Sequence, residues 1–538
     1  MRKWIWAGVV IVGLLTWSRI RLVNSLPDQG YFAKYSIVAD QILAGHIPRD
    51  RLLDFSPLYL WFVVGLRALG IGLRGIRPLQ IILVSGAALL VAIVARRFGA
   101  IALFAAPIFV LGSRAALVCA TDLEPETLIL ILNAGALACI VEDSRPRLSG
   151  QRRPVVLHFL GGLLLGFSAA CRPVAVLVAI GLAIVCRSWR ILASTFVPII
   201  VLLIVNVSMT GELTLMDPGT VFYEGMNPSA SGYEGVQPRI ITELQRQSDD
   251  PDYLHVAYRL VASRALGRPV TRAESNRYWT GKALAFVRAY PSAALRLVAK
   301  KFYFALHSYD AYDLATMVRK NFLLARFPFI PFGVMVALAI VALLLRVRGI
   351  APFVVFAAAI GITLVVFYVT ARQREAMIPS MAVLASAGVA VIVERKQIFP
   401  AMIAIVIAVL LTIDGNAQRE DAAGWSVLRN PFERAVALEQ GGRWGEADAL
   451  LGQLGDYRPI QENRAVSSIA YYRAVAAAHL GRDPRPFLVR AEEEAPGNEH
   501  VLAWEAALGD ARAEKRLFAL HDPFTAHRSL LAARQQGM

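Results

Sequence analysis

Long apolar runs separated by short polar segments dominate the first three quarters of the chain. The first run covers residues 2–23, and at about 20 residues it is long enough to cross a bilayer as a helix. Repeated runs of about 17 to 22 residues are not typical of a soluble core, so the pattern predicts an all-α polytopic membrane protein. The later predicted spans are 124–141, 155–171, 173–186, 191–209, 325–346, 350–370, 377–393 and 398–413.

Three more apolar segments lie early in the chain, at 57–71, 78–96 and 98–120. The segments on both sides of this region are predicted to lie outside the cytoplasm, so the number of crossings between them must be even. Either the short segment 57–71 re-enters the membrane without crossing it, or 98–120 is broken near Arg114. The total is then about 11 or 13 crossings, and not 12.

Short basic loops predict the orientation of these spans. Arginine and lysine cluster at 145–153, 187–190, 346–348 and 395–396. Cytoplasmic loops carry an excess of such residues, so we expect all four loops in the cytoplasm. The loops 24–56 and 210–324 and the tail 414–538 then lie on the other side, in the periplasm if the membrane is a bacterial inner membrane.

Composition and charge support the same class of protein. The chain has 538 residues, 56% of them hydrophobic, and a formal net charge of +16, with a mean hydropathy of +0.51. We attribute the positive charge to topology and to anionic lipid rather than to nucleic acid. The four cysteines have no paired spacing, which indicates small apolar residues rather than disulfides or a metal site. The first run has no small-residue cleavage site, so we expect a retained helix rather than a signal peptide.

The tail 414–538 has a different character, because it is rich in alanine, leucine, glutamate and arginine with helical periodicity. Gly441-Gly442, Leu480-Gly481 and Leu508-Gly509 resemble the turns between helices of tetratricopeptide repeats. Their spacing is uneven but averages near the repeat length of about 34 residues. The tail is therefore predicted to be a soluble helical-repeat domain with a possible peptide partner, and an unrelated domain of helical hairpins is the alternative.

Carboxylates stand at two of the predicted external junctions. Asp28 follows the first span, where a carboxylate can take a proton from an attacking hydroxyl group. By residue type alone, an N-cap of the next helix, which should end at Gly45, is the stronger interpretation. Asp122 and Glu126 precede another span, and helix capping there, with Pro125 in the first turn, competes with a role in binding an acceptor.

Cations stand at external junctions as well. Arg372 and Arg374 precede the span 377–393 on the side where the positive-inside rule disfavours them. Arginine binds two phosphate oxygens at once, so we predict a phosphate ligand, with snorkelling to lipid headgroups as the alternative. Lys301 is a candidate for a second phosphate contact or a residue of a solvated helix face.

Two further arginines lie within or beside apolar runs, where an unpaired charge is costly. They are Arg114 and Arg172. We expect either of them to pair with Asp122 or Glu126, and the sequence does not distinguish the pairs.

The order of these features resembles the GT-C fold of membrane glycosyltransferases that use polyprenyl-phosphate sugars, over roughly residues 1–413. Within this fold, the chain is most similar to protein O-mannosyltransferases and lipid A aminoarabinose transferases. The motifs that carry the resemblance are Pro27-Asp28-Gln29-Gly30-Tyr31, Asp54-Phe55-Ser56-Pro57-Leu58-Tyr59, the aromatic turn 219–228, and Arg372-Gln373-Arg374 before Met377-Ile378-Pro379.

This resemblance implies roles for particular residues. In the family, the first external loop opens with an acidic catalytic base and closes with a second acidic residue. The implied site is Asp28 as the base, Asp54, Asp122 and Glu126 in the acceptor cavity, and Arg372, Arg374 and Lys301 on the donor phosphate. The histidines show no metal-ligand spacing, so no metal site is predicted; some relatives bind a divalent metal, and Asp54 with His307 is the one pair that the resemblance leaves open for it. No other cofactor is implied.

The resemblance implies an enzyme that transfers a hexose or pentose from undecaprenyl phosphate to a hydroxyl group of a protein or lipid glycan outside the cytoplasm. A lipid-linked oligosaccharide ligase would share this topology and differ in the size of its donor. A non-catalytic scaffold would depend on the repeat tail. A transporter would show paired broken helices in two repeats, and the sequence has no such symmetry.

We expect Asp28→Asn to abolish most transfer activity while the protein still folds and inserts. Asparagine keeps the size and the capping ability of aspartate but does not accept the proton, and a general base typically contributes about 100- to 10,000-fold. Sugar transfer by purified wild type and variant tests this expectation. A variant of nearly normal activity would leave Asp28 only the capping role.

Overall fold

The chain is helical in the part that the computed structural model describes, and no strand is present there. It divides into two compact units, one formed mainly by residues up to Gln418 and the other mainly by residues from Arg419. The described residues are 2–24, 33–46, 55–143, 155–211, 217–227, 230, 232, 241, 254–310, 329–412, 435–436, 438–439, 441–454, 465–494, 499–520 and 523–536.

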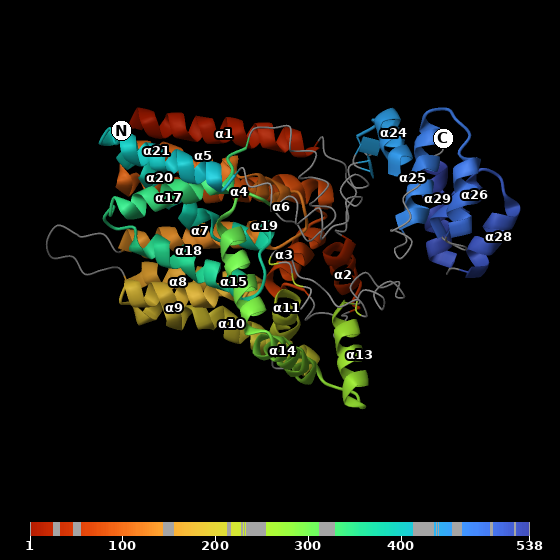
Figure 1. The fold of residues 1–538 in the computed structure, drawn as a ribbon, viewed down its shortest axis with the longest axis horizontal. Coiled ribbons are helices and arrows are strands. Elements are labelled where there is room, and N and C mark those ends of the chain that lie inside the picture. The colour runs from red at the N-terminus through yellow and green to blue at the C-terminus, as the bar shows by residue number, and fades with distance from the viewer. Residues whose placement is uncertain are drawn as a thin grey trace. The chain divides into compact units, whose positions relative to one another are not determined.

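The first unit is built around a bundle of apolar helices (Figure 1). These are α1 (Arg2–Asn24), α4 (Leu73–Ala95), α5 (Ala100–Gly112), α7 (Glu126–Asp143), α8 (Val155–Cys171), α9 (Val174–Val185), α10 (Trp189–Thr210), α17 (Phe332–Leu344), α18 (Ala351–Val366), α20 (Ile378–Glu394) and α21 (Ile398–Leu410). Two stretches among the described residues, Gly75–Phe98 and Trp189–Met209, are long and apolar enough to cross a membrane, and eight shorter apolar helices found there have 10–17 residues each.

The segment 98–120 is broken, as one of the two sequence alternatives requires. Helix α5 and the short helix α6 (Arg114–Ala120) form an angle of 53°, and together they make a third possible span. Ser113 separates them, and its side chain caps α6 by accepting a hydrogen bond from the backbone N–H of Ala116 at 3.3 Å. The break therefore follows from a serine that starts a new helix.

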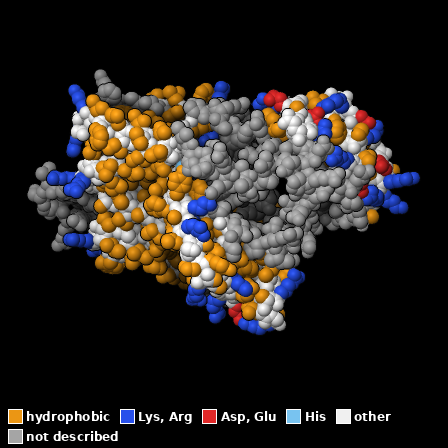
Figure 2. Space-filling view, in the orientation of Figure 1, with side chains coloured by type: hydrophobic (Ala, Val, Ile, Leu, Met, Phe, Trp, Pro, Cys, Tyr) orange, Lys and Arg blue, Asp and Glu red, His pale blue; other side chains and the backbone are white. Residues whose placement is uncertain are grey.

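Large apolar side chains cover much of the outer surface of the bundle (Figure 2). On α21, Ile398 and Phe399 are 77% and 72% exposed, and on α10 Ile204 is 64% exposed. Soluble monomers rarely expose contiguous apolar surface of this extent. The surface and the long apolar helices are compatible with membrane association.

Helices α8 and α10 approach closely because α8 has glycines where the two backbones meet. A Cβ atom on Gly162 would lie 2.3 Å from the carbonyl oxygen of Ile191, and one on Gly166 would lie 2.4 Å from that of Thr195. The Thr195 hydroxyl donates a hydrogen bond to the carbonyl oxygen of Gly162 at 3.0 Å. Small residues spaced four apart are a common means of close helix packing in membranes.

Shorter helices gather at one end of the bundle and position the candidate site (Figure 1). They are α2 (Ala33–Leu43), α3 (Pro57–Ala68), α6, α11 (Pro218–Gly225), α13 (Leu254–Leu266), α14 (Arg272–Ala289), α15 (Pro291–Leu306) and α19 (Ala371–Glu375). Thr271 and Glu274 form a capping box at the start of α14. The buried Trp279 packs its ring against those of Tyr223 and Tyr258, which joins α11, α13 and α14.

The second unit is a set of short helices. They are α24 (Trp444–Leu454), α25 (Ala465–His479), α26 (Arg485–Glu494), α27 (Glu499–Ala507), α28 (Ala511–Leu520) and α29 (Pro523–Gln536). Tight turns lie between α25 and α26 and between α27 and α28. The three turns predicted from the sequence each contain a glycine at positive φ, at Gly442, Gly481 and Gly509, and helical residues lie on both sides of each. Trp504 is 1% exposed in their shared core.

We expect Gly162→Ala to lower the stability of the first unit by about 1–3 kcal/mol, because the added methyl group meets backbone atoms of α10. Thermal unfolding in detergent is the measurement. Gly361→Ala on α18 is the matched control, because a Cβ atom there meets nothing within 4 Å and alanine favours the helix. Equal melting temperatures for the two variants would contradict the close packing of α8 and α10.

Candidate active site

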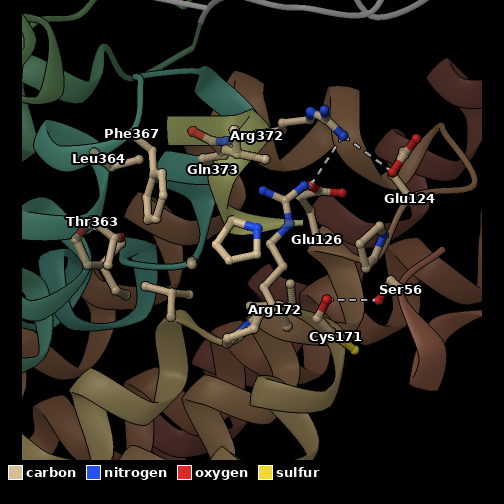
Figure 3. A pocket seen from close by; sticks show the side chains of 18 of the residues that line it. Ser56, Glu124, Glu126, Cys171, Arg172, Thr363, Leu364, Phe367, Arg372 and Gln373 are labelled. Carbon is tan, nitrogen blue, oxygen red and sulfur yellow. Dashed lines mark hydrogen bonds and ion pairs between the residues drawn. The ribbon is translucent and has the colours of Figure 1, made fainter. Parts of the chain in front are cut away.

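A cavity of about 600 Å³ lies at the end of the bundle where the short helices gather (Figure 3). Its wall is assembled from segments that are distant in the sequence, including Tyr35 of α2, Ser56 before α3, and residues of α7, α9, α11 and α18. The acidic, basic and histidine side chains on the wall are Glu124, Glu126, Arg172, Asp217, His255 and Arg372. The cavity therefore exists only in the folded first unit.

Two glutamates and two arginines form what we call the charge cluster, Glu124, Glu126, Arg172 and Arg372. Glu126 begins α7, its side chain is 1% exposed, and Arg172 forms an ion pair with its Oε1 atom. The Nη1 atom of Arg372 lies 3.4 Å from Glu124 Oε2 and 3.9 Å from Glu126 Oε1. Figure 3 shows both guanidinium groups close to Glu126. The formal charges cancel, which offsets part of the cost of burying them.

One carboxylate oxygen of Glu126 lacks a hydrogen-bond donor among the described residues. Its Oε2 atom is buried and has no hydrogen-bond partner among the residues that the structure describes. A buried carboxylate oxygen without a donor is costly, so such atoms in proteins are normally satisfied by a side chain, water or a ligand. A ligand hydroxyl group in the cavity would supply the missing donor.

Polar side chains of α4 donate hydrogen bonds to backbone carbonyl oxygens of the acidic turn before α7. Gln80 donates a hydrogen bond to the carbonyl oxygen of Asp122 at 2.6 Å, and Arg77 donates one to that of Thr121 at 3.1 Å. The Tyr59 hydroxyl in turn donates to Gln80 at 2.7 Å. Arg77 and Gln80 were not predicted from the sequence, although polar residues inside an apolar span often mark a functional or structural site.

Asp217 and His255 form the part of the wall contributed by the later helices. Asp217 precedes α11, and His255 Nδ1 lies 3.0 Å from its Oδ2 atom. Arg272 and Asn276 donate hydrogen bonds to its Oδ1 atom at 2.6 and 2.7 Å. Burial alone would raise the pKa of Asp217, but the contacts with His255 and Arg272 outweigh it and hold the pKa well below its ordinary value. The sequence offered no spacing that would single out this pair.

An apolar wall lies beside these charges. It contains side chains of α7, α9, α11 and α18 and of the residue just after α18, namely Ile129, Val174, Leu177, Val221, Ile360, Leu364 and Phe367. Pockets of this kind bind ligands through apolar area and orient them through a few polar groups. The cavity is therefore suited to a ligand that has a charged or hydroxylated part and an apolar part.

The sequence candidates from the acidic loops have different outcomes. Asp28 and Asp54 lie outside the described residues. Phe55 and Ser56, which follow Asp54, line the cavity, and the Ser56 hydroxyl donates to the Cys171 carbonyl oxygen at 3.0 Å. Glu126 lines the cavity and pairs with an arginine as predicted, whereas the side chain of Asp122 is buried and does not line the cavity.

Arg372 and Arg374 point to different surroundings. Arg372 lines the cavity, but Arg374 is 2% exposed and donates to Asp310 at 2.5 Å and to the Tyr309 carbonyl oxygen at 3.1 Å. Its guanidinium carbon lies 4.4 Å from the centroid of the Phe332 ring. Residues two apart on a helix do not share a face, so Arg374 holds the segment after α15 while Arg372 faces the cavity. Arg172 and Arg372 are therefore the two arginines that line the cavity, and Arg374 is not part of it.

Lys301 does not line the cavity either. Its side chain is fully buried, and its Nζ atom donates to the Val366 carbonyl oxygen at 3.4 Å. Burial lowers the pKa of Lys301 to about 8. The contact fixes α15 against the end of α18, and thereby supports the wall of the cavity indirectly.

A metal site at Asp54 and His307 is not defined by the geometry, because Asp54 lies outside the described residues. His307 Nδ1 accepts a hydrogen bond from the backbone N–H of Tyr309 at 2.9 Å. Within the described ranges, no group of three or more His, Cys, Asp or Glu side chains is placed to hold a metal ion.

No protein-family model matches the chain, and no curated protein or solved structure matches it either. A function for the cavity therefore has to be argued from its residues and their geometry. The charge cluster and the apolar wall are the features that carry this argument.

We expect Arg374→Ala to destabilise the first unit by about 3–5 kcal/mol, because it removes one partner of a buried ion pair and leaves Asp310 and backbone carbonyl groups without their donor. Unfolding in detergent is the measurement. Arg264→Ala, at an exposed position of α13, should be nearly neutral. Unchanged stability of Arg374→Ala would return Arg374 to the list of ligand-binding candidates.

Proposed function

We propose that the protein is a membrane glycosyltransferase of GT-C type that transfers a sugar from undecaprenyl phosphate to a hydroxyl group of an acceptor outside the cytoplasm. The observation that carries the proposal is the joining of two arginines, two glutamates and an apolar wall in one cavity. A polyprenyl-phosphate sugar has an isoprenoid chain, a phosphate and a hydroxylated ring, and these three parts match the three kinds of surface.

Arg372 and Arg172 are the proposed phosphate ligands. Guanidinium groups bind phosphate oxygens in pairs and keep their charge even when buried. Arg372 Nη1 lies 3.4 Å from Glu124 and 3.9 Å from Glu126, whereas Arg172 forms a direct ion pair with Glu126.

In the proposed reaction, the acceptor oxygen forms a bond to the anomeric carbon as the bond from that carbon to the phosphate oxygen breaks. Glu126 Oε2 accepts a hydrogen bond from the acceptor hydroxyl group and orients it. Asp28, the base implied by the family resemblance, takes the proton. The electron pair of the broken bond leaves with undecaprenyl phosphate, and the arginines stabilise the additional negative charge.

The proposed setting is a bacterial inner membrane, crossed about 11 or 13 times, with the cavity and the helical tail in the periplasm. Support comes from the apolar outer surface of the bundle and from the basic turns at the end away from the cavity. The bilayer would hold the isoprenoid chain, so the protein needs to bind only the phosphate, the sugar and the first part of the chain.

Undecaprenyl phosphate, the product common to all donors of this class, is the probe for the first test. We expect Arg372→Ala to weaken the binding of undecaprenyl phosphate in nanodiscs by about 10- to 100-fold, because the loss of one charge-assisted hydrogen bond typically lowers affinity by this factor. Arg372→Lys should restore only part of the affinity, because lysine lacks the planar pair of donors. Arg264→Ala is the control for a general loss of positive charge.

Wild-type affinity in both Arg372 variants would remove the donor-binding role. Binding by itself does not distinguish an enzyme from a scaffold or a transporter. Consumption of undecaprenyl-phosphate-linked sugars by membranes that contain the protein makes that distinction, because a scaffold leaves the lipid-linked sugar intact and a transporter moves it without cleaving it.

A further inference from the structure

Three tight turns at the end of the bundle away from the cavity share one geometry. They follow α9, α17 and α20, and each leads directly into the next apolar helix. In each turn, a backbone N–H just past the helix bonds to a carbonyl oxygen five residues earlier, from Ser188 to Ala183, from Val347 to Ala342 and from Gln397 to Ile392, at 2.9, 3.0 and 2.9 Å. This is the Schellman arrangement, in which one residue adopts a left-handed conformation.

That left-handed residue is basic in all three turns. Arg187, Arg346 and Lys396 have φ values of 49°, 49° and 50°, and they are the only non-glycine residues with positive φ in the described part of the chain. Ten described glycines occupy positive φ elsewhere. Glycine adopts this conformation without the steric cost that a Cβ atom brings. Local structure alone therefore does not explain a long basic side chain at the same position in three turns.

The three turns lie at the same end of the bundle. A Cβ atom on Gly181, near the end of α9, would contact Val355, near the start of α18. The short turn Arg96–Phe98 connects the other two, because a Cβ atom on Gly349 would lie 3.7 Å from Arg97, and one on the adjoining Gly99 would lie 2.5 Å from Glu394. Figure 2 shows Lys and Arg side chains along the left edge of the apolar surface.

Each basic residue stands between exposed apolar side chains. Ile184 and Trp189, on either side of Arg187, are 71% and 73% exposed, and Leu344 beside Arg346 is 62% exposed. The neighbours of Lys396 follow the same pattern, with Val393 55% and Ile398 77% exposed. Such residues are typical of the boundary between the hydrocarbon core and the headgroups of a bilayer.

The basic side chains are not neutralised within the described residues. Arg187, Arg346 and Lys396 are exposed, and no ion pair joins any of them to a described carboxylate. Arg190, Arg348 and Arg395 add further positive charge at the same turns. With Glu394 as an acidic neighbour of the third turn, the six basic residues still give these turns a net positive charge next to apolar side chains.

We propose that Arg187, Arg346 and Lys396 form a binding surface for the phosphate headgroups of anionic lipids, which we call the basic rim. Each of the three side chains is exposed, and the exposed apolar neighbours enter the acyl region beside the bound headgroup. A soluble phosphate would use the charges but not these apolar neighbours. The basic rim is separate from the cavity, so its role does not depend on the chemistry proposed there.

The test uses the full-length protein in detergent and compares added phosphatidylglycerol with added phosphatidylcholine. The triple variant Arg187→Gly, Arg346→Gly and Lys396→Gly removes the charges and the backbone strain together. Each basic residue near an anionic surface is worth about fivefold in affinity, so the variant should bind phosphatidylglycerol on the order of 100-fold more weakly by native mass spectrometry. Its melting temperature without lipid should equal or exceed that of the wild type.

The matched control is Arg264→Gln, Arg277→Gln and Arg288→Gln, which removes three exposed charges from α13 and α14. It should bind phosphatidylglycerol like the wild type, and equal losses in both triple variants would overturn the proposal in favour of net charge alone. Asparagine at the three rim positions tolerates the left-handed conformation and should reproduce the loss seen with glycine. Two further results would overturn the proposal. One is wild-type binding of phosphatidylglycerol by the glycine variant. The other is inorganic phosphate raising the melting temperature of the wild type as much as phosphatidylglycerol does.

Discussion

The burial of Glu126 is the constraint on which the rest of the candidate site depends. A carboxylate that is 1% exposed at the end of an apolar bundle is tolerated only if cations approach it closely. Arg172, just after α8, meets this requirement with a direct ion pair, and Arg372 of α19 lies 3.9 Å from the same oxygen, so both segments are positioned relative to the start of α7. The geometry of the cavity is in this sense a consequence of charge neutralisation.

The same constraint explains why polar side chains are buried deeper in the bundle. Asn133 of α7 donates to the carbonyl oxygen of Ala376 at 3.0 Å and accepts from the Ser168 hydroxyl at 2.8 Å. These bonds connect α7, α8 and the region after α19 just below the charge cluster. Because these groups are buried, a lost partner is costly, and such internal bonds also favour one arrangement of the helices. The cluster and its supports therefore act as one unit.

Much of the fold was accessible from local sequence patterns. The apolar runs, the helix that precedes Gly45 and the three glycine turns of the tail follow from periodicity and from the preference of glycine for tight turns, and the break in 98–120 was one of two alternatives that the sequence left open. The pairing of an arginine with Glu126 was also predicted, because an isolated charge beside an apolar segment is costly. These features depend on residues that are close in sequence or on a general energetic rule.

The sequence by itself determined the helical class, most element positions and the residue types that a charged site would use. Only the tertiary structure decided which residues share that site. Arg372 and Arg374 are alike in sequence, but the helix turns one toward the cavity and the other toward Asp310. Asp217 and His255 reach the wall through the packing of later helices. Helix packing and charge pairing determine which distant residues become neighbours, and neither produces a periodic pattern in the sequence.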